Sequence, residues 1–577
     1  MDNKEAALIF RDIADILEIK NENIFRVRAY RQAASRIEAL GRQLSEMYKE
    51  DPSSISDVPG IGKDLFGKIE EMVTTGHLEF YSRLVKEFPA GFLDLLNLPG
   101  LGPKKLRKLR DVLGVKNIDE LEKACLSGKI AGIEGMGEIT QRKIIAEISR
   151  FKKNEGRMLA PLAEELADRI ILHLSSDSNF KKIEKAGSLR RGAETVGDID
   201  ILVWAKDPLR AARRLVSFPG AERVLSKGPS KCSIEAEGAH QVDMRLVEKK
   251  CFGAALLYFT GSKQHNIKIR QLAKKKNYKL NEYGVFSISP SGREKFLAGK
   301  TEKEVYEQLS MQWVPPELRE DRGEVEASLK GRLPKDLLEL GDIRGDLHLH
   351  TVDSDGMMTL EGLIEAALEK GYSYMAVTNH SKLVRIANGM DEKRLLKHVE
   401  HIRKISRKYK KIKVLAGVEV DILRDGTLDL EDAALKELDI VIAAVHSNFS
   451  ADRNSQTERL IRAIDNRYVN ILAHPSGRLI TKRDPLDFDK RKVFLRASQN
   501  NVVLEINTHG ERVDLNDIDC MLAKELGAKF AVNTDSHQKR HMDGMKLGVS
   551  TARRAWLEKK DVVNTYSFEE LRKVLKR

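Results

Sequence analysis

The 577-residue chain is 41% hydrophobic and 32% charged, which is typical of a soluble globular protein, and its length suggests about three or four domains. It contains no apolar run near the roughly 20 residues that span a bilayer and no signal-peptide pattern at its start, and its four cysteines lack the spacing of a disulfide framework or a zinc knuckle, so we expect a cytoplasmic protein. Its net charge of +13 is compatible with nucleic-acid binding.

Three similar segments lie in the first part of the chain: Val58–Lys63, Leu98–Pro103 and Ile133–Glu138. Each joins an apolar residue to a Gly-x-Gly turn and then to a helical pattern. Such glycines let backbone N–H groups approach a phosphate at a helix N-terminus. The pattern resembles the helix-hairpin-helix motif, which binds the DNA backbone without reading sequence, although plain helix connectors remain the alternative. We expect four glycines to contact DNA: Gly60, Gly62, Gly100 and Gly102.

The segment Gly187–Val203 reads GSLRRGAETVGDIDILV and combines a glycine turn, two arginines and two aspartates. Its DIDILV stretch alternates like a strand, so Asp198 and Asp200 should project from one face. Adjacent carboxylates favour bound cations, and hard oxygen ligands suit Mg²⁺ that is shared with substrate phosphates. The glycine turn, Ser188 and Arg191 offer N–H, hydroxyl and guanidinium donors to a polyphosphate. The segment predicts a site for a metal-bound nucleoside triphosphate; the alternative is a solvated acidic strand.

A third acid, Asp243, lies in the predicted strand Val242–Arg245 and completes a carboxylate trio of the kind that holds a pair of Mg²⁺ ions. Further on, Leu257–Ser262 reads LYFTGS, and Gly261–Leu280 contains seven Lys or Arg residues and no Asp or Glu. Five segments together are highly specific for one family: GSLRRG, GDIDILV, QVDMRL, YFTGS and LNEYGVF. Through them, residues 1–317 resemble a family X DNA polymerase, the group that includes DNA polymerase beta.

The resemblance implies a role for each matching residue. The catalytic Mg²⁺ ligands would be Asp198, Asp200 and Asp243. The nucleotide-binding residues would be Arg157, Gly187, Ser188, Arg191, Gly197, Tyr258, Phe259, Gly261 and Asn266. Within this set, Arg157, Ser188 and Arg191 would hold the triphosphate. Tyr258, Phe259 and Gly261 would line the sugar pocket, Asn266 would touch the base edge, and Arg270 would contact the template side.

Two positions differ from the family pattern. Gln241 stands where vertebrate relatives carry arginine, which would alter the electrostatics beside Asp243. Lys68 matches the lysine that forms a Schiff base with an abasic sugar in beta-type enzymes, but Asp64 stands where those relatives carry a basic residue. A Schiff-base lysine must be partly deprotonated. Abasic-site lyase activity is therefore a hypothesis beside the alternative that Lys68 is a solvated phosphate contact.

Ten of the 14 histidines follow residue 340, and many fall at the ends of short predicted strands. Strand ends of a barrel converge on one mouth, and mixed imidazole and carboxylate ligands suit Zn²⁺, Mn²⁺ or Fe²⁺. The motifs H-x-H, S-D-G, G-x-E, A-H-P and D-S-H make residues 341–577 similar to a PHP domain, which is named for polymerases and histidinol phosphatases. This resemblance implies nine ligands for a Mn²⁺ or Zn²⁺ cluster that hydrolyses phosphoesters: His348, His350, Asp355, His380, Glu419, His446, His474, Asp535 and His537.

Within that set Glu419 would be the bridging ligand. Asn379 departs from the usual aspartate before His380, which would weaken the support of that ligand. We expect four other histidines to be ordinary core or surface residues: His398, His401, His509 and His541.

We expect a multidomain α/β chain. Its parts would be a helical DNA-binding domain that resembles the 8-kDa domain of the beta-type enzymes (1–85), a fingers-like helical domain with helix-hairpin-helix motifs (86–155), a nucleotidyltransferase palm with a mixed β-sheet (156–260), a nucleotide-selection subdomain (261–317), a linker (318–340) and a PHP distorted α/β barrel (341–577).

We conclude that the sequence predicts a monomeric DNA-directed DNA polymerase that uses dNTPs to fill short gaps in gapped or primer–template DNA during repair, including base excision repair. The PHP domain would act as a metal-dependent 3′→5′ exonuclease or phosphoesterase. Three alternatives stay open: a terminal or RNA nucleotidyltransferase, a DNA-end-binding scaffold with vestigial sites, and a small-molecule phosphatase in the C-terminal part.

Overall fold

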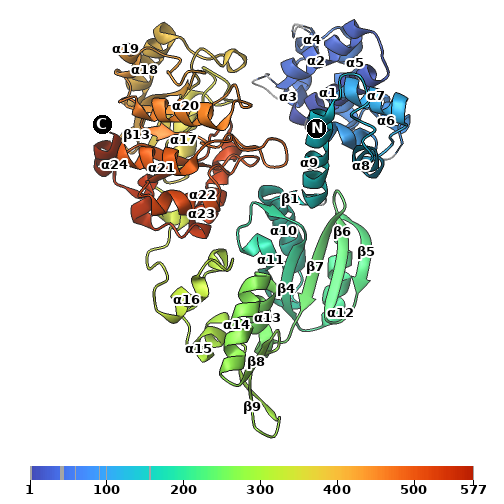
Figure 1. Ribbon diagram of the computed structural model, residues 1–577, viewed down its shortest axis with the longest axis vertical. Coiled ribbons are helices and arrows are strands. Elements are labelled where there is room, and N and C mark those ends of the chain that lie inside the picture. Colours follow the sequence, from blue (N-terminus) through green and yellow to red (C-terminus); the bar gives the residue numbers. More distant parts are fainter. Residues whose placement is uncertain are drawn as a thin grey trace. The chain divides into compact units, whose positions relative to one another are not determined.

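The computed structural model describes residues 3–575 apart from 39, 41–43, 57, 59, 90, 99, 155 and 156. The chain forms two compact units (Figure 1). The first comprises Met1–Glu155 with Thr481–Asp484, and the second comprises Gly156–Ile480 with Pro485–Arg577. The domain boundary expected at 155/156 falls on residues outside the description. Across the described residues, no helix has the length and apolar character that crossing a membrane requires.

The first unit is helical in its described residues, as the sequence predicts. Two hydrophobic cores hold it together, one around Phe10, Tyr30 and Ile69 and the other around Phe92, Leu106 and Ile148. Its helices are α1 (Asn3–Ile19), α2 (Ile24–Glu38), α3 (Leu44–Glu50), α4 (Ser53–Ser56), α5 (Lys63–Thr75), α6 (Glu79–Lys86), η1 (Leu93–Asn97), α7 (Pro103–Leu113), α8 (Ile118–Leu126) and α9 (Glu138–Asn154).

The middle of the second unit begins with a mixed five-stranded sheet in the order β2-β4-β7-β6-β5, in which β4 and β7 run parallel and the other neighbours run antiparallel. Alternate residues of β4 separate onto two faces: Ile199, Ile201 and Val203 pack in one core with α10 and α12, and Leu202 packs in another with α13. The elements are β1 (Met158–Leu159), α10 (Ala160–Ser175), β2 (Phe180–Lys185), α11 (Gly187–Arg190), β3 (Thr195–Val196), β4 (Ile199–Ala205), α12 (Pro208–Val216), β5 (Ala221–Lys227), β6 (Lys231–Ala236), β7 (His240–Leu246), η2 (Lys249–Cys251) and α13 (Phe252–Thr260).

A smaller subdomain follows the sheet and has its own core. This core also receives Leu318, Val325 and Leu333, so the stretch that the sequence predicts as a linker is folded and partly buried. Arg319 and Glu324 are completely buried there. The elements are α14 (Lys263–Lys275), β8 (Tyr278–Asn281), β9 (Gly284–Ile288), β10 (Glu294–Ala298), α15 (Glu302–Gln308), η3 (Pro316–Leu318) and α16 (Glu324–Leu329).

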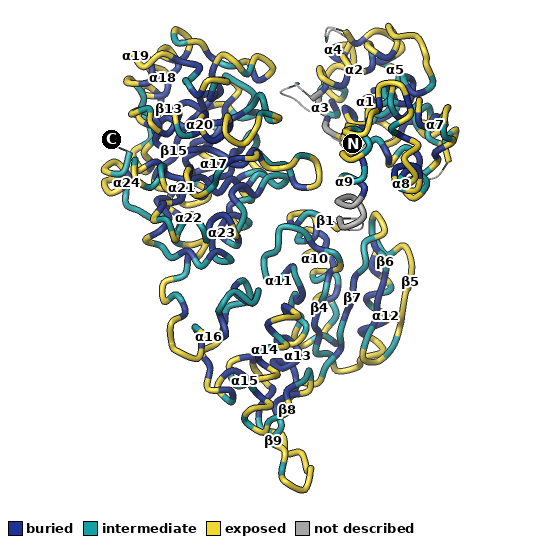
Figure 2. The backbone as a smooth tube through the Cα atoms, in the orientation of Figure 1, coloured by how far each residue is buried: buried dark blue, intermediate teal, exposed yellow. Residues whose placement is uncertain are grey.

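The C-terminal part is a nearly closed barrel of seven parallel strands in the order β11 to β17, as the sequence predicts. A bridge between Leu349 and Ser536 links its two edges. The strands are buried on both faces (Figure 2), which explains their continuous apolar runs. They are β11 (Gly345–Asp346), β12 (Tyr374–Val377), β13 (Lys413–Asp421), β14 (Ile440–Ala444), β15 (Ile471–Leu472), β16 (Val503–Asn507) and β17 (Phe530–Asn533).

Helices surround this barrel. The α-helices are α17 (Leu360–Glu369), α18 (Glu392–Ser406), α19 (Asp432–Leu435), α20 (Arg453–Asp465), α21 (Lys490–Gln499), α22 (Asp517–Glu525), α23 (Met545–Arg554) and α24 (Phe568–Leu575). The short 3₁₀ turns are η4 (Leu340–Asp342), η5 (Arg385–Ala387), η6 (Lys539–Gly544), η7 (Lys559–Asp561) and η8 (Val563–Thr565).

Candidate functional sites

Three aspartates meet on two adjacent inner strands of the mixed sheet. Asp198 precedes β4, Asp200 lies within it, and the parallel register pairs Asp200 with Asp243 on β7. One carboxylate oxygen from each of the three lies within 4.8 Å of the others. The chain therefore brings together the predicted trio from two strands that are far apart in sequence.

Asp200 leaves no room for a side chain at Gly187, the first residue of the GSLRRG segment. Gly187 has φ +61°, and a Cβ atom there would lie 2.3 Å from Asp200 Oδ2. Gly187 begins the short helix α11, and Arg191, which follows this helix, donates from Nη1 to the Thr260 carbonyl at 2.6 Å. Gly187, the first of the predicted phosphate-binding residues, thus lies directly against Asp200 of the acidic trio.

The three acids have different electrostatic surroundings. Burial raises the pKa of Asp200 to about 7, and the charges of Asp198 and Asp243 add to the rise. Burial also acts to raise the pKa of Asp243, but Lys231 Nζ lies 2.7 Å from its Oδ2, Gln241 Nε2 donates to its Oδ1 at 3.0 Å, and its pKa is lowered overall. Gln241 therefore supplies a neutral donor where vertebrate relatives have a charge. Lys231, which the sequence analysis missed, supplies the positive charge.

Arg157, which is predicted as a triphosphate ligand, lies far in sequence from the GSLRRG segment but contacts the residues that directly precede Asp198. It immediately precedes β1, which pairs antiparallel with β3. Its guanidinium donates to Thr195 Oγ1 at 3.0 Å and to the Thr195 carbonyl at 2.6 Å. A Cβ atom on Gly197 would lie 3.2 Å from Arg157 Nη1, so this glycine leaves room for the guanidinium.

The predicted sugar and base contacts lie at the junction of α13 and α14. The Tyr258 and Phe259 rings are perpendicular with centroids 5.1 Å apart, and Tyr258 is 36% exposed. Asn266 donates from Nδ2 to the Tyr258 backbone carbonyl at 2.7 Å, which fixes the Asn266 side chain against the end of α13. Gly261 follows the helix at φ +73°, and Arg270 is exposed on α14.

In the first unit the three glycine turns have one geometry. Gly60, Gly100 and Gly135 lie at φ between +80° and +90°. In each turn the next residue donates a backbone hydrogen bond of about 3 Å to the residue three positions earlier. Gly62 and Gly102 then cap α5 and α7 with ordinary φ values and no side-chain cap, which leaves the helix N–H groups to an external acceptor.

Lys68 lies on α5 beside two aromatic rings. Its Nζ is 5.2 Å from the Phe80 centroid, 5.9 Å from the Tyr30 centroid and 2.5 Å from Asp64 Oδ1. The lysine is thus partly enclosed and paired with the acid that departs from the family pattern. Lyase activity stays a prediction.

The nine predicted ligands of the C-terminal part follow or occupy the carboxyl ends of the barrel strands. Three ligand groups of suitable geometry form: His350, Asp355, His380 and His537; His348, His350 and Asp535; and His380, Glu419 and His446. Among the described residues, none of His398, His401, His509 and His541 belongs to these groups. His474 and Asp535 adopt positive φ values of +27° and +51°, which are uncommon for residues other than glycine.

Glu419 lies at the centre of the imidazoles. Its Oε1 is 2.9 Å from His474 Nε2 and 3.3 Å from His446 Nε2. Its Oε2 is 3.0 Å from His380 Nδ1 and 3.3 Å from His348 Nε2. Burial acts to raise the pKa of Glu419, but His380, His348 and His446 lower it to well below its ordinary value. This carboxylate is therefore held ionised between nitrogen donors.

Several of these buried atoms make no hydrogen bond within the described residues, although they lie close together. They are His348 Nε2, both ring nitrogens of His350, His380 Nδ1, Glu419 Oε2, His474 Nδ1 and Asp535 Oδ1. Buried polar atoms normally have partners, and a donor set of imidazoles and carboxylates suits a transition metal. The residues present thus fit a metal cluster.

Further residues orient the ligands, and the sequence analysis did not identify them. Glu505 on β16 lies 2.8 Å from His348 Nδ1 and also accepts from the His474 backbone N–H at 2.8 Å. Asp421 lies 3.2 Å from His446 Nδ1. An acid within an apolar strand, as in VVLEIN, is the signal that could have revealed Glu505. Asn379 contacts Thr351, Ser354 and His398 rather than His380, so it fixes the loop before Asp355.

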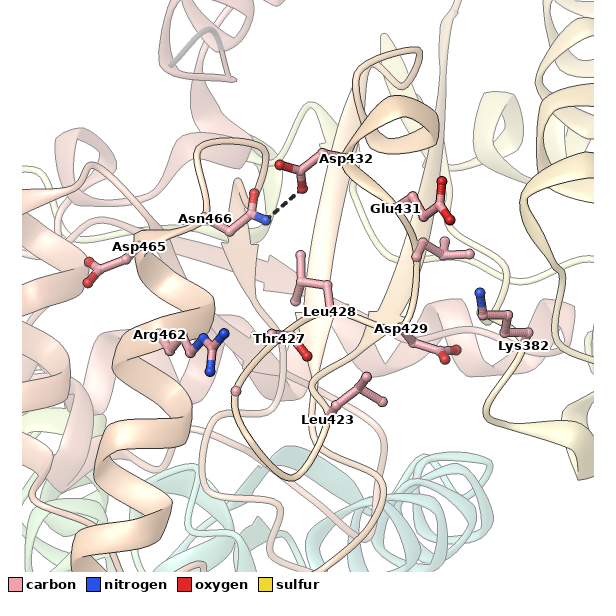
Figure 3. A pocket seen from close by; sticks show the side chains of 12 residues that line it. Lys382, Leu423, Thr427, Leu428, Asp429, Glu431, Asp432, Arg462, Asp465 and Asn466 are labelled. Atoms are coloured by element: carbon pink, nitrogen blue, oxygen red, sulfur yellow. Dashed lines mark hydrogen bonds between the residues drawn. The ribbon is translucent and has the colours of Figure 1, made fainter.

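A surface pocket elsewhere on the barrel has mixed charge (Figure 3). Lys382, Asp429, Glu431 and Arg462 contribute to its lining, and Asn466 Nδ2 donates to Asp432 Oδ1 at 3.0 Å. None of the nine predicted ligands lines it. We assign no catalytic role to this pocket.

Comparison with known families identifies four regions. Residues 1–78 match a helix-hairpin-helix domain, 92–150 a SAM-like helix-hairpin-helix tandem, 255–320 the DNA polymerase beta thumb, and 346–509 the PHP domain.

One of the similar proteins matches the whole chain, and others match little more than a third of it. The chain is 38% identical to the DNA polymerase/3′-5′ exonuclease PolX of Bacillus subtilis over 100% of both proteins. Over 38% of its length it is 30% identical to a probable phosphatase of Thermoanaerobacter sp., of which it covers 89%. It is also 29% identical, over 36% of its length, to a probable phosphatase of a Shewanella species, of which it covers 81%.

Proposed function

This chain belongs to the PolX family of DNA polymerases, in which a family X polymerase is joined to a PHP domain, and we propose that it fills short gaps in DNA during repair and trims 3′ ends. The observation that carries the polymerase proposal is the acidic trio beside the GSLRRG turn. Asp198, Asp200 and Asp243 each offer a carboxylate oxygen within 4.8 Å of the others, and Gly187, the first residue of that turn, lies against Asp200. The substrates would be dNTPs and gapped or primer–template DNA.

The acidic trio would hold Mg²⁺, which would supply charge neutralisation of the phosphates and a lower pKa of the primer 3′-hydroxyl. Arg157, Ser188 and Arg191 would orient the triphosphate through charged and hydroxyl donors. Lys231 and Gln241 hold Asp243 in the ionised form that a cation requires. These roles follow from the family pattern and from the contacts of each residue.

Selection of the nucleotide would depend on the α13–α14 junction. The hydrogen bond from Asn266 to the Tyr258 backbone carbonyl holds the Asn266 side chain, which would touch the base edge while Tyr258 would line the sugar pocket. Gly261 would bring its backbone close to the sugar and so exclude a 2′-hydroxyl. Arg270 would meet the template strand, and Gly60, Gly62, Gly100 and Gly102 would let helix N-termini bind DNA phosphates without sequence preference.

In the PHP domain the nine clustered residues would hold Mn²⁺ or Zn²⁺, which would supply an activated water and neutralise a phosphoryl group. Glu419, at the centre of five imidazoles within 3.5 Å, would be the bridging ligand. Glu505 and Asp421 would fix the orientation of His348 and His446. The proposed reaction is 3′→5′ removal of nucleotides.

A second function of the PHP site has support from the two relatives named as probable phosphatases. In that case the site would hydrolyse terminal phosphate monoesters, for example a 3′-phosphate that blocks extension. Release of inorganic phosphate from a 3′-phosphorylated primer, without loss of a nucleotide, would distinguish it from exonuclease action.

The test is a time course on a labelled one-nucleotide-gapped duplex with Mg²⁺ or Mn²⁺, with and without dNTPs. We expect Asp243→Ala to abolish extension alone, and His348→Ala/His350→Ala to abolish shortening alone. Template-independent addition or acceptance of ribonucleotides would favour a terminal or RNA transferase. Absence of extension by the wild-type chain would reject the polymerase proposal, and shortening by the double variant would reject the PHP site as the nuclease.

A further inference from the structure

The PHP domain reaches the turn that carries the proposed triphosphate ligand Arg191. Within the second unit, helix α23 packs against the residues that follow α11. Gly192 lies at φ +65°, and a Cβ atom there would lie 2.9 Å from Ser550 Cβ on α23. Arg554, the last residue of α23, donates from Nη1 to the Arg191 carbonyl at 2.9 Å. The polymerase turn therefore rests directly on a PHP helix.

One carboxylate links the two arginines. Glu320 Oε1 lies 2.9 Å from Arg191 Nε and 2.7 Å from Arg554 Nη1. Arg554 is held from its other side by Asp517 of α22, whose Oδ2 is 2.8 Å from Arg554 Nε and 3.0 Å from Arg322 Nη1. The Arg191, Glu320, Arg554 and Asp517 side chains are each at most 16% exposed, so their charges interact strongly.

The shared carboxylate has consequences for an anionic ligand. Burial acts to raise the pKa of Glu320, but Arg554 and Arg191 lower it overall, so Glu320 carries a full negative charge beside the proposed triphosphate site. With Arg554 present, two guanidinium groups share this charge. Without Arg554, Arg191 alone would neutralise Glu320, and less of its charge would be left for a triphosphate.

We propose that Arg554 of the PHP domain is a positioning residue for the polymerase reaction: by pairing with Glu320 and holding the Arg191 carbonyl, it keeps the Arg191 guanidinium available to the incoming nucleotide. The inference rests on the proposed role of Arg191 as a triphosphate ligand. It predicts that a substitution in the PHP domain, away from its metal ligands, weakens dNTP binding.

Arg553, which lies next to Arg554 in α23, provides a matched control. Arg553 pairs with Glu317 at 2.7 Å and donates to the Leu338 carbonyl at 2.9 Å, and within the described residues it pairs with neither Glu320 nor Arg191. Arg553→Ala removes one guanidinium ion pair from α23, whereas Arg554→Ala removes the pairs with Glu320 and Asp517 and the bond to the Arg191 carbonyl. A difference between the two variants therefore separates the contacts of Arg554 from the general docking of α23, and the added Glu320→Gln substitution isolates the Glu320 connection.

The experiment measures kcat and KM for dNTP on gapped DNA with the full chain. We expect Arg554→Ala to raise KM about tenfold with kcat within about twofold of wild type, while Arg553→Ala changes neither by more than about twofold. Arg554→Ala/Glu320→Gln should return KM to within about twofold of wild type, because the charge that captures Arg191 is gone. Arg554→Lys should give an intermediate KM, and its retained charge provides a second variant if Arg554→Ala folds poorly. The PHP nuclease rate should be unchanged in all of them.

The proposal is overturned if Arg553→Ala raises KM as much as Arg554→Ala, if KM does not change in Arg554→Ala and Arg554→Lys, or if Glu320→Gln fails to restore it. The proposed polymerase function fails separately, if wild type does not extend primers. In that event calorimetry of dNTP with Mg²⁺ decides the inference: weaker binding by Arg554→Ala than by Arg553→Ala supports it, and equal binding rejects it.

Discussion

At the scale of single residues, we expect the proposed metal ligand Asp200 to make metal binding depend on pH. Burial and two acidic neighbours raise its pKa to about 7 in the protein without ions, from an ordinary value of 3.8. Because the pKa is raised, Asp200 holds a proton below this pH, and a cation must displace that proton to bind. We expect Mg²⁺ affinity to increase with pH, about tenfold per unit below pH 7, and to level off above it.

Calorimetric titration with Mg²⁺ between about pH 5.5 and 8.5 measures this dependence. The titration uses the His348→Ala/His350→Ala variant, because in it the PHP site should contribute least to the measured metal binding. Asp200→Asn in that background should lose the pH slope along with most of the affinity. An affinity that is flat across the range would show that Asp200 is not protonated in the ion-free site.

A second residue-scale prediction concerns Glu505, which lies behind His348 and is completely buried. Replacing it by Gln keeps the shape but removes the charge that orients the imidazole. We expect Glu505→Gln to weaken Mn²⁺ binding at the PHP site about 10- to 100-fold, with a matching fall in the nuclease rate at limiting metal. Primer extension should be unchanged. Glu431→Gln, an exposed acid of the same barrel, is the control, and equal effects of both variants would contradict a role in orienting His348.

At the scale of elements, the glycine turns of the first unit separate a folding role from a binding role. Gly100 lies at φ +80°, where a side chain is strained. Gly102 has φ −75°, caps α7, and has open space around the position of a Cβ atom. Serine is a good helix cap, so only close approach of a DNA phosphate would require glycine at this position.

We therefore expect Gly62→Ser/Gly102→Ser to melt like wild type and to bind gapped DNA about tenfold more weakly, with a reduced dependence on salt. Gly100→Ala should instead lower stability by about 1 kcal/mol or more. Thermal unfolding and fluorescence-anisotropy titrations at several salt concentrations measure both effects. Full DNA affinity in the double serine variant would indicate that these turns are only helix connectors.

Elements also show what the sequence could and could not predict. The alternation of DIDILV placed Asp198 and Asp200 on one face, and the strand-end histidines predicted a barrel mouth, because both depend on local periodicity. The contact of Lys231 with Asp243 was not predictable from local sequence, because only the antiparallel pairing of β6 with β7 brings the two residues together. The charged stretch that the sequence predicts as a linker contains Arg319, which is completely buried. Glu302 Oε1 lies 2.6 Å from its guanidinium and neutralises the buried charge. Such long-range pairs leave no local pattern.

At the scale of the whole molecule, the polymerase and PHP parts of the second unit share one packed surface of paired charges. Arg478 pairs with Glu194, Lys546 with Glu164, and Arg554 with Glu320. None of these pairs was evident from the sequence, since each joins residues more than 200 positions apart. The family assignment and the order of domains were predictable, because each domain carries its own local motifs.

The PHP barrel should depend on its ions for stability. Seven buried ring or carboxylate atoms at its mouth have no hydrogen-bond partner within the described residues, and buried polar groups without partners cost free energy of folding. Ions that bind only the folded barrel stabilise it by mass action. We expect chelation to lower one calorimetric unfolding transition by about 5–10 °C, and added Mn²⁺ or Zn²⁺ to restore it. His348→Ala/His350→Ala should lose this response, whereas Asp243→Ala should keep it, because the acidic trio lies in the palm. Identical melting curves with and without chelator would mean that the converging atoms do not hold a metal cluster in the folded protein.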